Sequence, residues 1–209
     1  MSGTIASVLA GARLVPVLTV PDIATAAPLA DALSAGGARC AEVTFRTSGA
    51  EQVLKTMAAH GGLAVGAGTV LSAEQAERAV AAGARFVVSP GFDEQVVMKC
   101  RELGVPVVPG IATATELMRA LRAGLDTVKI FPAEPLGGIR TLRALAAPFP
   151  GVRFVPTGGI SAPRLTEYLA EPAVLAVGGS WMATASHLGR GDFEAVQRLT
   201  AEAVERSTR

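Results

Sequence analysis

Three ionisable side chains lie in two short apolar stretches of the chain. Lys129 is at the centre of TVKIF (residues 127–131), while Glu42 and Arg46 flank the VTF sequence of residues 43–45. An ammonium group among apolar side chains is costly unless it is paired or neutralised. A neutral lysine amine can attack a ketone to form a Schiff base, and the iminium makes the adjacent carbon acidic. A nearby carboxylate could then transfer the protons.

A structural role for the same residues stays open at this point. Lys129 and Glu42 could form a buried ion pair that only holds two strands together. Alternatively, the lysine could extend along the apolar surface until its ammonium reaches the rim. Ionisable groups with perturbed surroundings are frequent at functional sites, and this favours the chemical interpretation.

The pattern of the whole chain indicates how these residues are positioned. Short apolar, β-branched runs recur with room for one helix between successive runs, at residues 15–20, 40–45, 63–69, 86–90, 105–110, 127–132, 154–159 and 174–180. This alternation predicts a single (β/α)8 TIM barrel over residues 1–209, with an N-terminal helical extension. A doubly wound open sheet is the alternative fold.

Several of the intervening segments begin with helix-start signals. Capping boxes are predicted by three pairs at the required spacing, Ser48 with Glu51, Ser72 with Gln75, and Thr113 with Glu116. Pro28 falls within the first helix between strands, so we expect a kink or a late start there.

Strand alternation predicts which side chains enter the barrel. Side chains two residues apart share a face, so Val128 and Ile130 should face the helices and Lys129 should face inward. By the same rule Glu42 and Arg46 point inward. Active sites of such barrels lie at the carboxyl ends of the strands, where these residues are expected.

The glycine-rich ends of the last two runs predict an anion site. Gly158-Gly159 and Gly179-Ser180 leave backbone N–H groups free to converge on a phosphate. One glycine pair would be weak evidence, since tight turns use glycine anyway, but two pairs on neighbouring strands strengthen the prediction.

Composition excludes several other classes of protein. The net charge of +1, with acidic and basic residues interspersed, favours neither nucleic acid nor membrane binding. Two cysteines make no disulfide framework, and the first twenty residues lack a signal-peptide layout, so we expect a cytoplasmic location. Neither histidine has metal-ligand spacing, and no GxGxxG follows an early strand, so we expect no metal and no dinucleotide cofactor.

Seven blocks along the chain together resemble one known family. The blocks are EVTFRT (42–47), VGAGTVL (65–71), SPGF (89–92), VPGIAT (108–113), KIFPAE (129–134), PTGGI (156–160) and VGGSW (177–181). In this order they resemble the 2-keto-3-deoxy-6-phosphogluconate (KDPG) and 4-hydroxy-2-oxoglutarate (KHG) aldolases. The resemblance covers essentially the whole chain and implies a class I aldolase of the Entner–Doudoroff pathway that needs no cofactor and assembles as a homotrimer.

The resemblance also implies roles for residues at the pyruvate end of the substrate. Lys129 would form the Schiff base and Glu42 would be the general acid and base. Arg46 and Thr69 would hold the pyruvate carboxylate. Pro90 and Phe131 would line the pyruvate pocket.

At the aldehyde end, the resemblance places Thr157 against the aldehyde half of the substrate. The backbone amides of Gly158, Gly159, Gly179 and Ser180 would bind the phosphate. One departure from the family pattern is Phe45, where a smaller aliphatic residue is common; it should face the helices and affect packing only.

Two other functions stay open. A phosphosugar isomerase or epimerase on a similar barrel would need an acid/base pair or a metal, but not a nucleophilic lysine. A non-catalytic barrel could bind phosphosugar or pyruvate in the same pocket, although such a protein has no need of a buried lysine.

Overall fold

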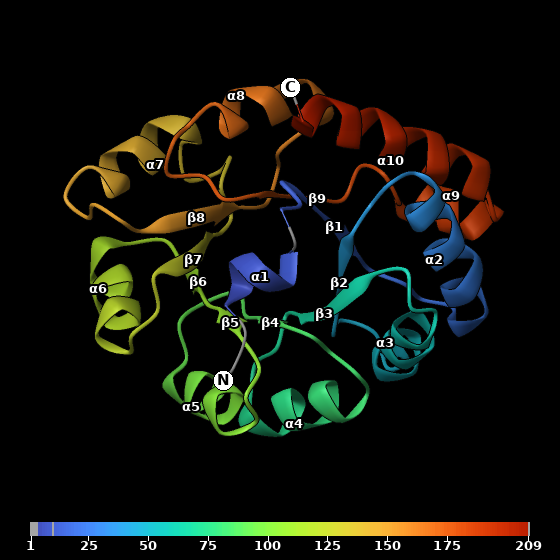
Figure 1. Cartoon of the computed structure of the whole chain (residues 1–209), viewed down its shortest axis with the longest axis horizontal. Helices are drawn as coiled ribbons and strands as arrows, with labels where there is room; N and C mark the ends of the chain where they lie inside the picture. Colours follow the sequence, from blue (N-terminus) through green and yellow to red (C-terminus); the bar gives the residue numbers. More distant parts are fainter. Residues whose placement is uncertain (1–3, 10, 209) are drawn as a thin grey trace.

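The computed structural model describes residues 4–9 and 11–208. Short parallel strands lie at the centre and helices surround them (Figure 1). The strands are β1 (Leu14–Leu18), β2 (Cys40–Thr44), β3 (Ala64–Gly68), β4 (Val87–Val88), β5 (Val107–Val108), β6 (Gly110–Ile111), β7 (Thr127–Ile130), β8 (Arg153–Pro156) and β9 (Val177–Gly179).

The helices alternate with the strands along the chain, except that β6 follows β5 directly and α10 follows α9. They are α1 (Ile5–Leu9), α2 (Ala26–Ala35), α3 (Ala50–Ala59), α4 (Ala73–Ala81), α5 (Glu94–Glu102), α6 (Ala114–Arg122), α7 (Ile139–Ala146), α8 (Leu165–Leu169), α9 (Ala185–Arg190) and α10 (Phe193–Thr208). Two short 3-10 turns, η1 (Ile23–Thr25) and η2 (Ala162–Arg164), precede α2 and α8. None of the helices in the described part of the chain has both the length and the apolar character needed to span a bilayer.

The strands form two parallel sheets that adjoin at both ends. One has six strands in the order β5-β4-β3-β2-β1-β9, and the other has the order β6-β7-β8. Pro109 alone separates β5 from β6, because a proline has no N–H to donate to the ladder. At the other junction, isolated bridges join Phe154 to Val174 and Thr157 to Gly178. The predicted α/β class is confirmed as a barrel-like fold, while the single fifth strand predicted over residues 105–110 is two strands.

Strand register places Lys129 and Glu42 as predicted. Lys129 pairs with Gly110 on one side and Val155 on the other, and its neighbours Val128 and Ile130 are buried in the apolar core on the helix side. The side chain of Lys129 therefore lies on the inner face of the strands, and so does that of Glu42 on β2.

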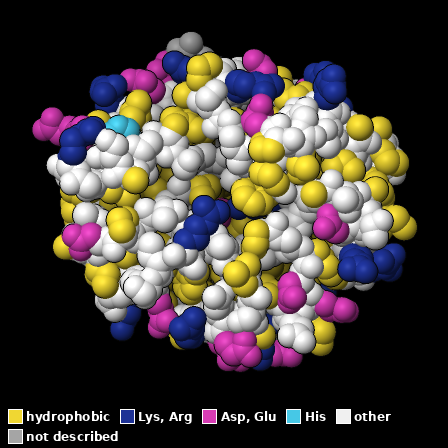
Figure 2. Space-filling model, turned by 180° about the vertical axis from the view of Figure 1, so that it is seen from behind, with side chains coloured by type: hydrophobic (Ala, Val, Ile, Leu, Met, Phe, Trp, Pro, Cys, Tyr) yellow, Lys and Arg dark blue, Asp and Glu magenta, His cyan; other side chains and the backbone are white. Residues whose placement is uncertain are grey.

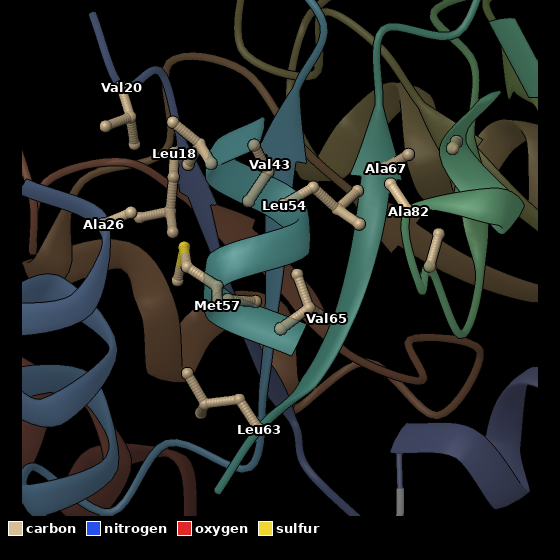
Figure 3. Close-up of a cluster of buried hydrophobic side chains, with 14 of the residues drawn as sticks. Leu18, Val20, Ala26, Val43, Leu54, Met57, Leu63, Val65, Ala67 and Ala82 are labelled. Carbon is tan, nitrogen blue, oxygen red and sulfur yellow. The ribbon is translucent and has the colours of Figure 1, made fainter. Parts of the chain in front are cut away.

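The largest apolar core lies between the strands and the helices outside them. Figure 3 shows Leu54 and Met57 of α3 packed toward Val43 of β2 and Val65 of β3. Phe45 is partly buried against this cluster, so its predicted outward direction is confirmed. Each fully buried aliphatic side chain contributes about 1.5–3 kcal/mol, which holds the helices on the strands.

Helix α1 covers one end of the strands. Its Ile5 and Leu9 are buried in one apolar cluster with side chains from the inner face of the strands. These side chains are Val15 of β1, Val88 of β4 and Phe86, which directly precedes β4. Figure 1 shows α1 in front of the centre of the strands. This end is therefore sealed by apolar side chains.

The helix starts confirm one of the three predicted capping boxes and correct the other two. Thr113 and Glu116 form a complete capping box on α6. Ser72 accepts a hydrogen bond from the backbone N–H of Gln75, but the Gln75 side chain accepts from Leu71 N at 2.7 Å instead of completing a box.

The box predicted from Ser48 is wrong. Helix α3 is capped by Gly49 without a side-chain hydrogen bond, because the helix begins one residue later than the pattern suggested. Pro28 is the third residue of α2, which starts only after the η1 turn, so the late start is confirmed. In the first turn a missing backbone N–H costs no intrahelical hydrogen bond.

Candidate active site

Lys129 and Glu42 form a buried contact across the inner face of the strands. The Nζ of Lys129 donates to Oε1 of Glu42 at 3.2 Å, and the two residues are 5% and 3% exposed. The ammonium also lies 5.2 Å from the centroid of the Phe131 ring. The pair combines a nucleophile and a proton-transfer group within hydrogen-bond distance.

The space beneath this pair is apolar. A void of about 10 Å³ is lined by Lys129, Glu42 and a set of apolar side chains, namely Ile5, Leu9, Val15, Phe86, Val88, Val108 and Val155. This volume is at the lower limit for one water molecule. The charged groups are thus shielded from solvent on the α1 side, and a substrate has to approach from the other end.

Two glycines of β3 make room for the site. A Cβ added to Gly68 would lie 2.1 Å from Oε1 of Glu42, and one added to Gly66 would lie 2.3 Å from the Phe86 ring. The GAG sequence of residues 66–68 therefore allows the Glu42 carboxylate and the Phe86 ring to pack directly against the backbone of β3.

Arg46 and Thr69 meet at the carboxyl ends of β2 and β3. The Nε of Arg46 donates to Oγ1 of Thr69 at 3.3 Å. Thr69 has a φ of 56°, a left-handed conformation that costs a residue with a β-carbon about 1–2 kcal/mol. Such strained residues cluster at functional sites. The guanidinium is solvent-exposed and could bind a carboxylate with two parallel hydrogen bonds.

A cavity of about 170 Å³ opens at this end of the molecule. Its lining residues are Val17, Thr19, Arg46, Phe131, Thr157, Gly158, Gly159, Ile160, Gly178, Gly179 and Ser180. Figure 2, seen from the opposite side to Figure 1, shows Lys and Arg atoms across a hollow near the centre of that face. The cavity can hold an anionic molecule of small size.

The wall formed by β8 and β9 is made of closely packed backbone. Gly158 and Gly159 have φ values of 100° and 80°, a region that favours glycine. A Cβ on Gly178 would lie 2.2 Å from Oγ1 of Thr157, and one on Gly179 would lie 1.9 Å from the ring of Trp181. Substituting Gly179 would therefore displace Trp181, which packs against a core cluster, and would not test anion binding alone.

The structure brings most of the predicted site residues together. Lys129 and Glu42 are in contact, and Thr69 joins the cavity through Arg46. The cavity is lined by Arg46, Phe131, Thr157, Gly158, Gly159, Gly179 and Ser180. Lys129, Glu42 and Pro90 do not line it; the carbonyl of Pro90 lies behind Gly110, where a Cβ would come within 2.1 Å.

Sequence reasoning missed two cavity residues at the end of β1, Val17 and Thr19. Thr19 Oγ1 lies 2.9 Å from Thr44 Oγ1, and the Thr44 hydroxyl is also 2.9 Å from the carbonyl of Leu18. The rule that strand ends carry the site, applied to the first strand as well, would have found them.

Other reactive groups contribute little to the site. Burial, followed by the charge of Glu42, raises the pKa of Cys40 to about 12, so this thiol stays protonated and unreactive. Within the described ranges, no group of three His, Cys, Asp or Glu side chains is arranged to hold a metal ion.

Comparison with known proteins connects this geometry to one family. The model of the KDPG and KHG aldolase family matches residues 5–199. A 2-dehydro-3-deoxy-phosphogluconate aldolase of Treponema pallidum is 51% identical over 203 residues, covering 97% of each chain. A KHG/KDPG aldolase of Escherichia coli is 44% identical over 200 residues, covering 95% of this chain and 94% of the other.

A solved structure shows the same similarity. The KDPG aldolase of Legionella pneumophila, with pyruvate captured as a covalent carbinolamine intermediate, is 37% identical and superimposes with a TM-score of 0.91. The match covers 95% of this chain and 97% of that one.

Proposed function

We propose, on the premise that the chain belongs to the KDPG and KHG aldolase family, that it cleaves KDPG to pyruvate and glyceraldehyde 3-phosphate. It is an aldolase, a carbon–carbon lyase that acts through a lysine Schiff base. KHG, which yields pyruvate and glyoxylate, is the second substrate of the proposal. The names of the Escherichia coli relative cover both substrates.

Lys129 is the proposed nucleophile. Its amine adds to the C2 ketone to give a carbinolamine, and loss of water leaves an iminium. The C3–C4 bond then breaks: a base takes the C4 hydroxyl proton, the aldehyde departs, and the bonding electrons form an enamine with the iminium. Protonation at C3 and hydrolysis release pyruvate and free Lys129. Glu42, 3.2 Å from the lysine, is the proposed acid and base.

The two ends of the cavity suit the two ends of the substrate. Arg46 and Thr69 are proposed to bind the carboxylate that KDPG and KHG share. The glycine backbone of β8 and β9 is proposed to bind the phosphate, and Thr157 to contact the aldehyde half. Phe131 would line the pyruvate pocket directly. Pro90 would shape it indirectly, because its carbonyl packs against Gly110. These roles are supported by the positions of the residues: most line one cavity, and Pro90 packs against Gly110, which pairs with Lys129.

We further propose that the two sheets form one closed (β/α)8 barrel and a single domain over residues 1–209, with α1 as the N-terminal extension. Two observations support this: only Pro109 lies between β5 and β6, and isolated bridges join Phe154 to Val174 and Thr157 to Gly178. The homotrimer and the cytoplasmic location stay predictions.

The observation that carries the proposal is the buried contact of Lys129 and Glu42 beside a cavity that has Arg46 at its edge. A phosphosugar isomerase or epimerase has no use for a nucleophilic lysine. A purely structural ion pair would need no adjoining anion cavity.

Borohydride reduction in the presence of pyruvate tests the proposal. We expect a single reduced adduct on Lys129, absent from Lys129→Met and retained in Lys55→Met, a change at an exposed lysine. Turnover should persist in EDTA. An adduct on Lys55 or Lys99, no adduct on active enzyme, or chelator-sensitive turnover that a divalent ion restores would refute the mechanism.

A further inference from the structure

Glu134 lies just outside the residues that line the cavity and has two strong donors. The carboxylate accepts a hydrogen bond from Tyr168 Oη at Oε1 and another from Arg164 Nη1 at Oε2. Tyr168 is the only tyrosine of the chain and is fully buried in α8. The interaction therefore joins the loop after β7 to η2 and α8. The chemistry proposed above makes no use of it.

The backbone of the same loop pairs with the end of β8. Ala133 N donates to the Thr157 carbonyl at 2.8 Å, and Glu134 N donates to the Gly158 carbonyl at 3.0 Å. A Cβ on Gly159 would lie 2.8 Å from Cβ of Glu134. Glu134 thus packs directly on the outer side of the Gly158-Gly159 turn.

The inner side of this turn is a wall of the cavity. Gly158 and Gly159 line it together with Thr157 and Ser180. A turn of two glycines has little intrinsic rigidity, so its neighbours have to fix the direction of its amides. Pro132 and Phe131 pack against Gly158, and the Glu134 side chain, held by Tyr168 and Arg164, is the nearest neighbour of Gly159.

We propose that Glu134 is a positioning residue that sets the phosphate-binding geometry of the Gly158-Gly159 turn. This inference deepens the proposed function and rests on it. Glu134 does not touch the reacting atoms; it acts through the backbone of the turn. Its effect should therefore be confined to ligands that carry a phosphate.

The carboxylate is required because it must accept from two donors. Burial, and then the hydrogen bond to Glu134, raises the pKa of Tyr168, so the phenol keeps its proton. A glutamine at position 134 could accept from Tyr168 with its oxygen, but its NH₂ group would face the guanidinium of Arg164, another donor. Tyr168→Phe removes one hydroxyl and leaves the ring to fill the core.

Kinetics with the two substrates test the inference. For Glu134→Gln we expect KM for KDPG to rise about 10-fold, the factor that 1.4 kcal/mol represents, with a smaller rise for Tyr168→Phe. KM for KHG, which has no phosphate, should stay within about twofold. The dissociation constant of inorganic phosphate should rise as KM for KDPG does, and the yield of the pyruvate adduct should not change.

Glu171→Gln is the matched control. Glu171, which follows α8, accepts hydrogen bonds from Arg143 of α7 and does not contact the Gly158-Gly159 turn. This variant should leave both KM values unchanged. Equal losses on both substrates, or no change in Tyr168→Phe and Glu134→Gln, would overturn the role of Glu134. If the unmodified enzyme forms no pyruvate adduct, the aldolase proposal itself fails, which is seen before any variant is compared.

Discussion

Glu42 and Lys129 lie 3.2 Å apart with almost no solvent exposure, so each is the main polar partner of the other. Removing one partner of such a buried pair typically costs about 3–5 kcal/mol, since the other charge is left alone. A substitution that keeps the size of the side chain and an oxygen that can accept the hydrogen bond, but removes the base, therefore tests the chemistry with the smallest structural change.

Glu42→Gln meets this requirement. We expect turnover to fall by about 10²–10⁴-fold, the usual contribution of general acid–base catalysis, while pyruvate is still trapped on Lys129 by borohydride. Steady-state rates and mass spectrometry of the reduced adduct measure the two effects. Turnover near that of the unmodified enzyme would mean that another group moves the proton.

Gly68→Ala is a more indirect test of the same carboxylate. The added Cβ would lie 2.1 Å from Oε1 of Glu42, so the side chain has to move. A displacement of about 1 Å can cost about 10²-fold in rate, and we expect a loss of at least this size. Gly189→Ala, which meets nothing within 4 Å, is the control and should retain full activity. Equal activity of the two variants would show that Glu42 tolerates displacement.

Among single residues, the sequence predicted the central pair and most of the cavity lining, but not the contacts that support them from behind. Two-residue alternation was enough to turn Lys129 and Glu42 inward. The contact of Glu134 with Tyr168 joins a loop to a helix 34 positions away, and no local period encodes such a pairing. The proximity of Gly68 to Glu42 likewise depends on the register between β2 and β3.

Among the elements, helix starts were predictable where a side chain makes the cap. Thr113 of α6 forms both bonds of its box with Glu116, whereas α3 begins at Ala50 after the N-cap residue Gly49, which has no side chain to form a cap. The division of the fifth strand follows from Pro109, a signal that the apolar run concealed. Strand existence was thus easier to predict than strand ends.

The cap of α6 should be measurable. Thr113→Ala removes the acceptor of the Glu116 amide, and we expect the free energy of unfolding to fall by about 1 kcal/mol. Thr115→Ala, at an exposed position of the same helix, should be neutral or slightly stabilising, because alanine favours helix. Denaturant titrations compare the two. Equal losses would mean that the cap contributes nothing.

For the whole molecule, the apolar side chains left on the surface bear on assembly. Leu71, Met98, Leu103, Met118 and Leu121 are between 37% and 59% exposed in the single chain. Burying such side chains in contacts between copies would stabilise the predicted homotrimer. We expect sedimentation equilibrium to give the mass of three chains, and a concentration-independent mass of one chain would contradict the prediction.

Helix α1 has a consequence for the order in which products leave. Because Ile5 and Leu9 close one end, the proposed function would place a pyruvate on Lys129 at the bottom of a dead end, with the aldehyde half between it and solvent. The three-carbon aldehyde should leave first and pyruvate last. In the synthetic direction pyruvate has to enter first. Product inhibition against KDPG should then be competitive for pyruvate and noncompetitive for glyceraldehyde 3-phosphate; the reverse pattern would indicate a second route out of the molecule.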